Sequence, residues 1–408
     1  MEFSPAENML LEATAAAARG GTVAWMQVAP EDWRELAELA AAHKLLPLVL
    51  EAVHGCPAAE SLPGREALRR EAIRQTALQV RKTADFLRVW QALEKAGLHP
   101  LAVKGLLCRQ LYPQGDCRVS ADEDLLVTDD EAAACGEVLR SLGLRPTAEP
   151  EPDAFETGWR AEDGLLYIEL HRRLFPPDSG ALGGLNGLLS GAEDRAEEYP
   201  AEPGRSVRSL CPHDHLLYLL LHAYKHFIHS GFGIRQVCDI GLWAETYAGR
   251  IDWDRLYDQC GSVRAQTFAA AVMAIAREHL GLGPELPARW RENAVDCAPM
   301  LKDLLSAGVY GSRDMSRRHS ASLTLNAVEA RHGGGRSGVL ATVFPGRKQL
   351  ERRYPVLKKH PAALPAVWCL RLFRYGRETR SDRNNSAAGS LRIARERTGL
   401  LKQYGILD

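Results

Sequence analysis

Two carboxylates, Asp122 and Asp124, lie one residue apart and directly ahead of an apolar run (residues 125–127) that is typical of a β-strand. Residues i and i+2 of a strand point to the same face, so we expect the two carboxylates to lie close together. Such a pair is unfavourable without a cation, because each negative charge disfavours ionisation of the other group. Carboxylate oxygens suit Mg²⁺. The pair therefore predicts a metal site at the edge of a buried sheet, with a phosphate-bearing partner.

A strand, a glycine and a helix precede this pair. Residues 101–103 are apolar and predict a short buried strand, Lys104 and Gly105 form a turn, and residues 106–111 predict a helix. A helix N-terminus presents backbone N–H groups to an anion, and a glycine there lets a phosphate approach the backbone closely. The segment therefore predicts an anion site, with Lys104 neutralising charge.

Two further charged groups belong to the same hypothesis. Arg118 lies four residues before Asp122, where its guanidinium could hold a phosphate with two hydrogen bonds. Residues 165–171 predict a strand on which Glu169 and His171 share one face. Glu169 is therefore a candidate for a third metal ligand, and His171 for a group near the reacting hydroxyl. A plainer interpretation also exists, in which the aspartates form an exposed acidic turn and Lys104 is a solvated charge.

The region from residue 101 to residue 127 resembles the uncharacterised nucleotidyltransferase family, within the polymerase-beta-like nucleotidyltransferase superfamily. That family carries a Lys-Gly turn, a Leu-Tyr-Pro, an arginine and an Asp-x-Asp-Leu-Leu-Val strand. The resemblance covers roughly residues 30 to 260. The matching residues are Lys104-Gly105, Leu111-Tyr112-Pro113, Arg118, Asp122 to Val127, Glu169-Leu170-His171, the helix around His222 and His226, and Arg235 to Asp239.

The resemblance implies an α+β fold with a small mixed sheet, flanked by N-terminal and C-terminal helical regions. It also implies a Mg²⁺-dependent enzyme that moves a nucleoside monophosphate from an NTP to an acceptor hydroxyl and releases pyrophosphate. Asp122, Asp124 and Glu169 would hold two Mg²⁺ ions, and Glu169 would also accept the hydroxyl proton. Lys104 and Gly105 would bind the triphosphate. ATP is the default donor because it is abundant.

Two residues depart from the family pattern. Position 123 is usually aliphatic and here is Glu123, whose burial without a partner would cost several kcal/mol. The third carboxylate is usually aspartate and here is Glu169. An alternative interpretation follows, in which the chain is a catalytically inactive nucleotide-binding or regulatory protein.

A predicted helix near residues 215–229 carries four histidines at offsets that place them on or near one face. His222 and His226, at i and i+4, could bind a metal, or they could form a polar face against the active-site sheet. Lys225 lies between them and could reach a phosphate. Arg235 and Asp239 are also at i and i+4, the spacing of a surface ion pair on a helix, whereas the resemblance implies a place in the wall of the cleft.

The pattern predicts four parts, with boundaries at residues 1–98 (an N-terminal helical cap), 99–210 (the α/β core), 211–310 (a helical domain) and 311–408 (a basic, mostly helical region). In the cap, a long amphipathic helix is expected from about residue 65 to residue 95, with no visible chemistry. In the core, residues 129–142 predict a helix, and residues 155–159, 165–171 and 207–210 predict strands.

Charge is distributed unevenly along a chain whose net charge is −1. Residues 311–383 contain 16 Lys/Arg against 5 Asp/Glu. A third interpretation is therefore a polyanion- or RNA-binding protein that uses this basic region, and the apolar residues 365–375 also suit a membrane-surface helix. No RNA-binding motif occurs, so sequence-specific nucleic-acid binding, to DNA or RNA, is not expected. The glycine run at residues 333–338 lacks the ending of a Walker loop.

Nine cysteines, an odd number with no Cys-x-x-Cys spacing, predict reduced thiols and a cytoplasmic location. No apolar run approaches the roughly 20 residues needed to span a bilayer, so no transmembrane segment is expected. The acceptor could be a small molecule, a peptide, a protein or an RNA, and the sequence does not choose among them.

Overall fold

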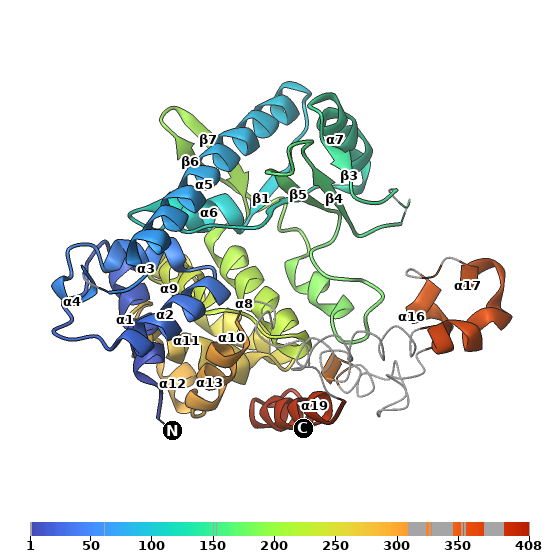
Figure 1. The fold of residues 1–408 in the computed structure, drawn as a ribbon. Helices are drawn as coiled ribbons and strands as arrows, with labels where there is room; N and C mark the ends of the chain where they lie inside the picture. The colour runs from blue at the N-terminus through green and yellow to red at the C-terminus, as the bar shows by residue number, and fades with distance from the viewer. Residues whose placement is uncertain are drawn as a thin grey trace.

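The computed structural model describes residues 2–60, 62–149, 151 and 153–308, and in the C-terminal part residues 324, 325, 328, 346–351, 354, 356–370 and 387–407. Its centre is a mixed five-stranded sheet in the order β1-β2-β5-β4-β3, so the fold is α+β as predicted (Figure 1). The strands are β1 (Leu101–Val103), β2 (Glu123–Leu126), β3 (Arg145–Pro146), β4 (Glu156–Arg160) and β5 (Tyr167–His171).

Strands β2 and β5 are parallel neighbours, and both pair with an antiparallel strand on their other side. Their residues alternate between two environments, because neighbouring side chains of a strand point to opposite faces. Leu125, Ile168 and Leu170 are almost fully buried in the core. The polar face carries Asp124 and Glu169, so the sheet places the predicted metal ligands on adjacent strands.

Helices cover the sheet and form a separate layer beside it (Figure 1). Helix α7 (Asp129–Ser141) begins at Thr128, whose hydroxyl accepts from the Glu131 N–H. It packs on β4 where Gly136 meets Trp159, and only a residue without a large side chain fits there. Helix α6 (Gly105–Arg109) follows β1 directly, as the strand–glycine–helix pattern predicted.

The long helix α5 (Arg65–Lys95) connects the N-terminal helices to the sheet (Figure 1). Its C-terminal half buries Leu87, Trp90 and Leu93 as the amphipathic pattern predicted. In its N-terminal half Ile73 and Val80 are 57% and 49% exposed, so the apolar pattern there does not face the core. The remaining N-terminal helices are α1 (Pro5–Ala18), α2 (Pro30–Ala42), α3 (Leu46–Ala52) and α4 (Pro57–Glu60).

A two-stranded hairpin, β6 (Glu197–Glu202) and β7 (Arg205–Ser209), forms a second sheet whose strand β7 lies next to β1. The sequence predicted only its second strand. A 3₁₀ segment, η2 (Gly183–Leu189), occupies the glycine-rich stretch before it. The helices that follow are α8 (Pro212–His229), α9 (Ile234–Thr246), α10 (Trp253–Ser262), α11 (Gln266–Leu280), α12 (Ala288–Glu292) and α13 (Ala298–Ala307).

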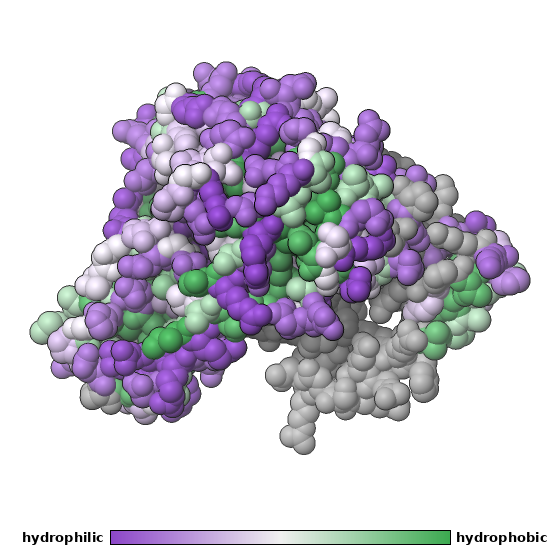
Figure 2. Space-filling view, turned by 90° about the horizontal axis from the view of Figure 1, so that it is seen from above, coloured by the Kyte–Doolittle hydropathy of each residue, from purple (hydrophilic) through white to green (hydrophobic). Residues whose placement is uncertain are grey.

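In the C-terminal part the described elements include α16 (Arg347–Glu351), α17 (Val356–Lys359), η5 (Pro361–Ala363) and α19 (Ala387–Gln403). Residues 364–370, in the first half of the predicted apolar helix, are also helical. Leu350, Leu357 and Val367 form a small hydrophobic cluster of their own. Residues 333–338 and 371–380, on which the glycine-loop and part of the basic-region predictions fall, lie outside the described residues. The four-part division of the chain stays a prediction. On the face shown in Figure 2, hydrophobic residues gather across the middle of a largely hydrophilic surface.

Candidate active site

Asp124, Glu169 and His171 converge on one point of the polar face of the sheet. The register places Asp124 directly beside Glu169 across the parallel β2–β5 pair, and His171 two residues further along β5. One ligand atom from each residue lies within 4.8 Å of the others. The two carboxylates at this separation can hold a divalent cation, and their oxygens suit Mg²⁺. His171 can join them as a ligand only in its neutral form.

The buried Asp124 carboxylate is paired with two basic groups. Lys104 Nζ lies 2.9 Å from Oδ2, and His171 Nε2 lies 3.2 Å from Oδ1. Burial disfavours the charged form of both Asp124 and His171, but the contacts between the charged groups outweigh burial. Lys104 and His171 therefore lower the pKa of Asp124. Hydrogen bonds to Asp124 and Glu169 raise the pKa of His171 to about 9. Glu156 on β4, which the sequence analysis did not single out, lies 3.8 Å from the other side of the His171 ring.

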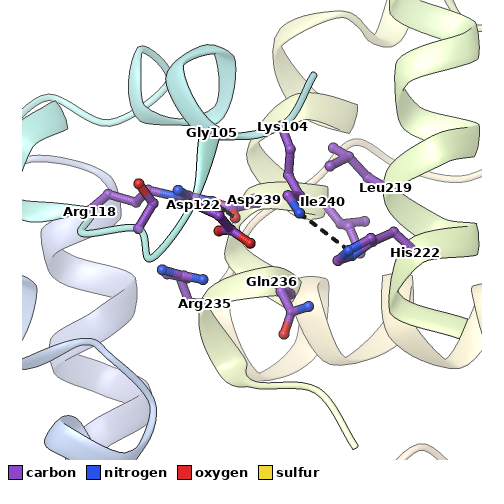
Figure 3. A pocket seen from close by; sticks show the side chains of 11 residues that line it. Lys104, Gly105, Arg118, Asp122, Leu219, His222, Arg235, Gln236, Asp239 and Ile240 are labelled. Carbon is purple, nitrogen blue, oxygen red and sulfur yellow. Dashed lines mark hydrogen bonds and ion pairs between the residues drawn. The ribbon is translucent and has the colours of Figure 1, made fainter. Parts of the chain in front are cut away.

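Asp122 lies just outside strand β2 and is partly exposed. It is not one of the three residues that share the 4.8 Å cluster. It lines an adjacent pocket together with Lys104, Gly105 and His222. Figure 3 shows Asp122 beside Arg118 and Arg235 on one side of this pocket, with Lys104 and His222 opposite. Burial, and to a smaller extent the nearby Asp122, oppose ionisation of Glu169, but the contacts with His171 and Lys104 lower the pKa of this carboxyl overall.

Lys104 adopts a backbone conformation that is rare for a residue with a side chain, with φ +63° and ψ −111°. Its backbone N–H donates to His215 Nε2 at 3.1 Å, and His215 Nδ1 lies 3.4 Å from the Ser209 hydroxyl. Burial lowers the pKa of His215 to about 3, so the ring is neutral and can accept this hydrogen bond. His215 thus fixes the turn that directs Lys104 toward Asp124. Its offset of seven residues from His222 was the available sequence signal.

Glu123 is 1% exposed, but it is not unpaired. Its Oε1 accepts from Arg109 Nη1 at 2.7 Å and from the Ser120 hydroxyl at 3.0 Å. A Cβ on Gly105 would lie too close to the other carboxylate oxygen of Glu123. Gly105 is therefore required by the ion pair behind the strand, in addition to any role in binding phosphate.

Arg118 is buried and held by Asp239. Its Nε donates to Asp239 Oδ1 at 3.1 Å, and the Tyr112 hydroxyl donates to the same oxygen at 2.9 Å. The Arg118 guanidinium thus has a carboxylate partner, and its contact with a phosphate stays a prediction. Asp239 forms a buried ion pair with Arg118 instead of the surface pair expected with Arg235, whose side chain reaches the Val119 carbonyl oxygen. These contacts tie α9 to the segment before β2. Arg118, Arg235 and Asp239 all line the pocket at the Lys104–Gly105 turn, the cleft-wall place that the resemblance implied for Arg235 and Asp239.

A family model described as uncharacterised nucleotidyltransferase matches residues 29–281, more than half of the chain. The chain belongs to this nucleotidyltransferase family. The match includes all the residues that converge on the site. No curated protein and no solved structure matches the chain.

The nucleotidyltransferase carries a neutral histidine pair on α8 beside the site. Lys104 Nζ lies 3.3 Å from His222 Nε2, and His226 Nε2 lies 3.3 Å from the same atom. Burial, then nearby lysines, hold the pKa of both histidines well below its usual range. Lys225 lies near Glu156 and Glu169, which partly offset the lowering of its pKa by burial. The α8 face therefore lines the site, as one of the two interpretations expected.

Helix α5 of the nucleotidyltransferase supports the segment before Asp122. Gln79 Oε1 accepts from the Ser120 N–H at 2.8 Å, and Lys82 Nζ donates to the carbonyl oxygens of Ser120 and Ala121. The predicted helix thus positions the site, a role that its sequence did not reveal. Among the helices in the described part of the chain, none has the length and apolar character to cross a membrane.

Proposed function

We propose that this nucleotidyltransferase moves a nucleoside monophosphate from an NTP to an acceptor hydroxyl in a Mg²⁺-dependent reaction on a polymerase-beta-like core. The observation that carries the proposal is the convergence of Asp124 and Glu169 from adjacent parallel strands, next to a pocket that begins at the Lys104–Gly105 turn. We propose ATP as the donor, because it is the most abundant NTP. Nine free cysteines are consistent with a cytoplasmic location.

Asp124 and Glu169 would hold the metal, with Asp122 joining from the rim of the pocket. Bound Mg²⁺ would stabilise charge on the attacking and leaving oxygens of a displacement at the α-phosphate. Lys104 and His171 supply positive charge next to Asp124, one at each carboxylate oxygen. A metal at Asp124 would compete with both contacts, and we expect at least one of them to separate.

The basic groups around the carboxylates would bind the triphosphate. Lys104 lines the pocket, and Lys225 lies on the neighbouring helix face. Gly105 begins α6, whose first N–H groups would be available to a phosphate at this turn. Glu169 is half-buried and could accept the proton of the acceptor hydroxyl. Arg118 also lines this pocket and would add positive charge there, whereas Glu123 is a structural residue paired with Arg109.

A pyrophosphate-release assay tests the proposal. The wild-type enzyme, incubated with Mg²⁺, ATP and a small-molecule cell extract as the acceptor source, is expected to release pyrophosphate. Asp124→Asn should lower the rate by about 100-fold or more, the scale for loss of a group that stabilises transition-state charge. Asp130→Asn, which removes an exposed carboxylate on α7, is the matched control and should leave the rate unchanged. Equal rates in wild type and Asp124→Asn would contradict the proposal.

The alternative of an inactive nucleotide-binding protein rested mainly on Glu123. Because Arg109 and Ser120 satisfy that carboxylate, its burial gives no reason to expect loss of catalysis. If wild type and Asp124→Asn both bind ATP but neither releases pyrophosphate, the inactive protein is the correct interpretation.

A further inference from the structure

A second hollow adjoins the site at Asp122. It lies between α5, the start of α3 and the segment that precedes β2. It shares Ser120, Asp122 and Arg235 with the pocket at the Lys104–Gly105 turn. The two hollows therefore meet at the carboxylate that the proposed function places at the edge of the metal site. The pocket at the Lys104–Gly105 turn is the proposed site of the triphosphate. The second hollow is therefore available to the acceptor.

Positive charge dominates the walls of this second hollow, which we name the α5 groove. Among its lining residues Lys44, Arg74, Lys82 and Arg235 are basic, and Asp122 is the one carboxylate. Lys82 is buried, donates to backbone carbonyl oxygens and lies near the Glu123 and Asp122 carboxylates, so the outer cations Lys44 and Arg74 provide most of the attraction. A ligand with a negative group is therefore attracted to the groove.

The outer cations are accessible to such a ligand. Lys44 is exposed. Arg74 is 61% exposed and pairs with Glu71 at 2.7 Å, an exposed pair of the kind that contributes little to stability. A phosphate or carboxylate could therefore compete for Arg74 while also contacting Lys44.

The groove also has an apolar wall. Leu46, Leu78 and Leu165 line it together with the outer cations and Asp122. Leu46 is buried, and the other two are partly exposed. A purely polar ligand such as a free sugar would leave this wall uncovered, whereas an apolar segment would be desolvated against it.

We propose that the acceptor is an amphiphilic anion. Its phosphate or carboxylate binds Lys44 and Arg74, its apolar segment lies against Leu78 and Leu165, and its hydroxyl reaches the metal site past Asp122. This inference rests on the proposed function and names the substrate class that the enzyme modifies. It also separates the acceptor from the nucleotide, because the two occupy different hollows.

Binding of hexyl phosphate to the full chain tests the inference, with hexanoate, hexanol and inorganic phosphate as comparison probes in calorimetry. Hexyl phosphate should bind at least tenfold more tightly than hexanol or inorganic phosphate. Comparison of hexyl phosphate with hexanoate shows whether the groove prefers a phosphate or a carboxylate. Lys44→Asn and Arg74→Ala should each weaken hexyl phosphate about fivefold, the size of an exposed charge contact. Asparagine is chosen because Lys44 has φ +59°, which asparagine tolerates. Leu78→Asn should weaken hexyl phosphate but not inorganic phosphate.

Arg70→Ala is the matched control, because Arg70 lies on the same helix, pairs with Glu66 at 3.8 Å and does not line the groove. It should leave binding unchanged. A non-hydrolysable ATP analogue with Mg²⁺ should bind together with hexyl phosphate. Competition between the two, or binding that Lys44→Asn and Arg74→Ala leave unchanged, would overturn the inference while leaving the nucleotide site intact. Intact hexyl phosphate binding without any pyrophosphate release would instead overturn the proposed function, and with it the assignment of the groove to an acceptor.

Discussion

Arg109 and Glu123 form a buried ion pair, with 2.7 Å between Nη1 and Oε1, directly behind the strand that carries Asp124. Both side chains are at most 3% exposed. The pair occupies a position at which the family pattern places an aliphatic residue, and Ser120 supplies a second hydrogen bond to the carboxylate. The site is thus supported from behind by a charged pair, which makes its integrity dependent on Arg109.

Removal of one partner of this pair should be strongly destabilising. Arg109→Met leaves the Glu123 carboxylate buried without its cation, which should lower the free energy of unfolding by about 3–5 kcal/mol. The double variant Arg109→Met/Glu123→Leu replaces both charges with apolar groups and should recover most of that loss. Urea denaturation measures all three proteins. A double variant that is no more stable than Arg109→Met would show that the ion pair is not the cause.

Gly105→Ala should destabilise the protein through the same pair. The new methyl group would overlap the Glu123 carboxylate, which Arg109 holds in place. We expect a loss of about 1–3 kcal/mol, the usual cost of overpacking, in thermal or urea denaturation. Gly399→Ala on α19 is the control, because a Cβ there meets no atom within 4 Å. A Gly105→Ala protein as stable as this control would contradict the account of the turn.

Acid should destabilise the protein in part through His215. Its pKa is about 3 in the folded state because of burial, with Asp239 as the charged neighbour that partly offsets the shift, against an ordinary value of 6.5. The unfolded chain therefore binds a proton between these values that the folded chain does not, so stability is lost as pH falls from 6.5 toward 3.

The slope from this one group should approach about 1.4 kcal/mol per pH unit. His215→Asn should remove it, which is visible as a smaller difference in the free energy of unfolding between pH 7 and pH 5. His54→Asn, at an exposed histidine, should keep the wild-type difference. The same pH dependence in His215→Asn and wild type would refute the neutral, buried state of this ring.

Metal affinity should depend on Glu169. Titration with Mn²⁺, followed by electron paramagnetic resonance in the presence of a non-hydrolysable ATP analogue, measures the bound ion directly. Glu169→Gln should weaken binding by about 10-fold or more, because a ligand is lost from a small set. Glu162→Gln, at an exposed glutamate in the turn between β4 and β5, is the control. Unchanged Mn²⁺ affinity in Glu169→Gln would exclude this residue as a ligand.

The sequence predicted the strands of the site because their apolar runs are short, continuous and bounded by turn residues. Strand alternation placed Asp122 with Asp124, and Glu169 with His171, on one face of their own strands. That Asp124 and Glu169 lie side by side across the β2–β5 pair followed only from the family resemblance, because strand order depends on contacts between segments far apart in the chain. For the same reason Glu156, which reaches His171 from β4, was missed.

Partners of buried charges were the least predictable part of the site. Arg118 and Asp239 are 121 residues apart, and nothing in either local pattern distinguishes a buried pair from a phosphate contact or a surface pair. Glu123 is a charged residue at a position expected to face the core, so the sequence indicated that it needs a partner. The sequence did not identify Arg109 as that partner. The exposed Ile73 and Val80 on α5 show that helical periodicity predicts an apolar face but not what covers it.

A crystal structure of the enzyme soaked with Mg²⁺ and a non-hydrolysable NTP tests the central claim most directly. The account predicts that Asp124 and Glu169 coordinate metal next to the α-phosphate, that the Lys104–Asp124 or the His171–Asp124 contact has separated, and that the triphosphate lies in the pocket at Gly105. A nucleotide bound elsewhere, with both contacts of Asp124 intact and no metal between the two carboxylates, would contradict it.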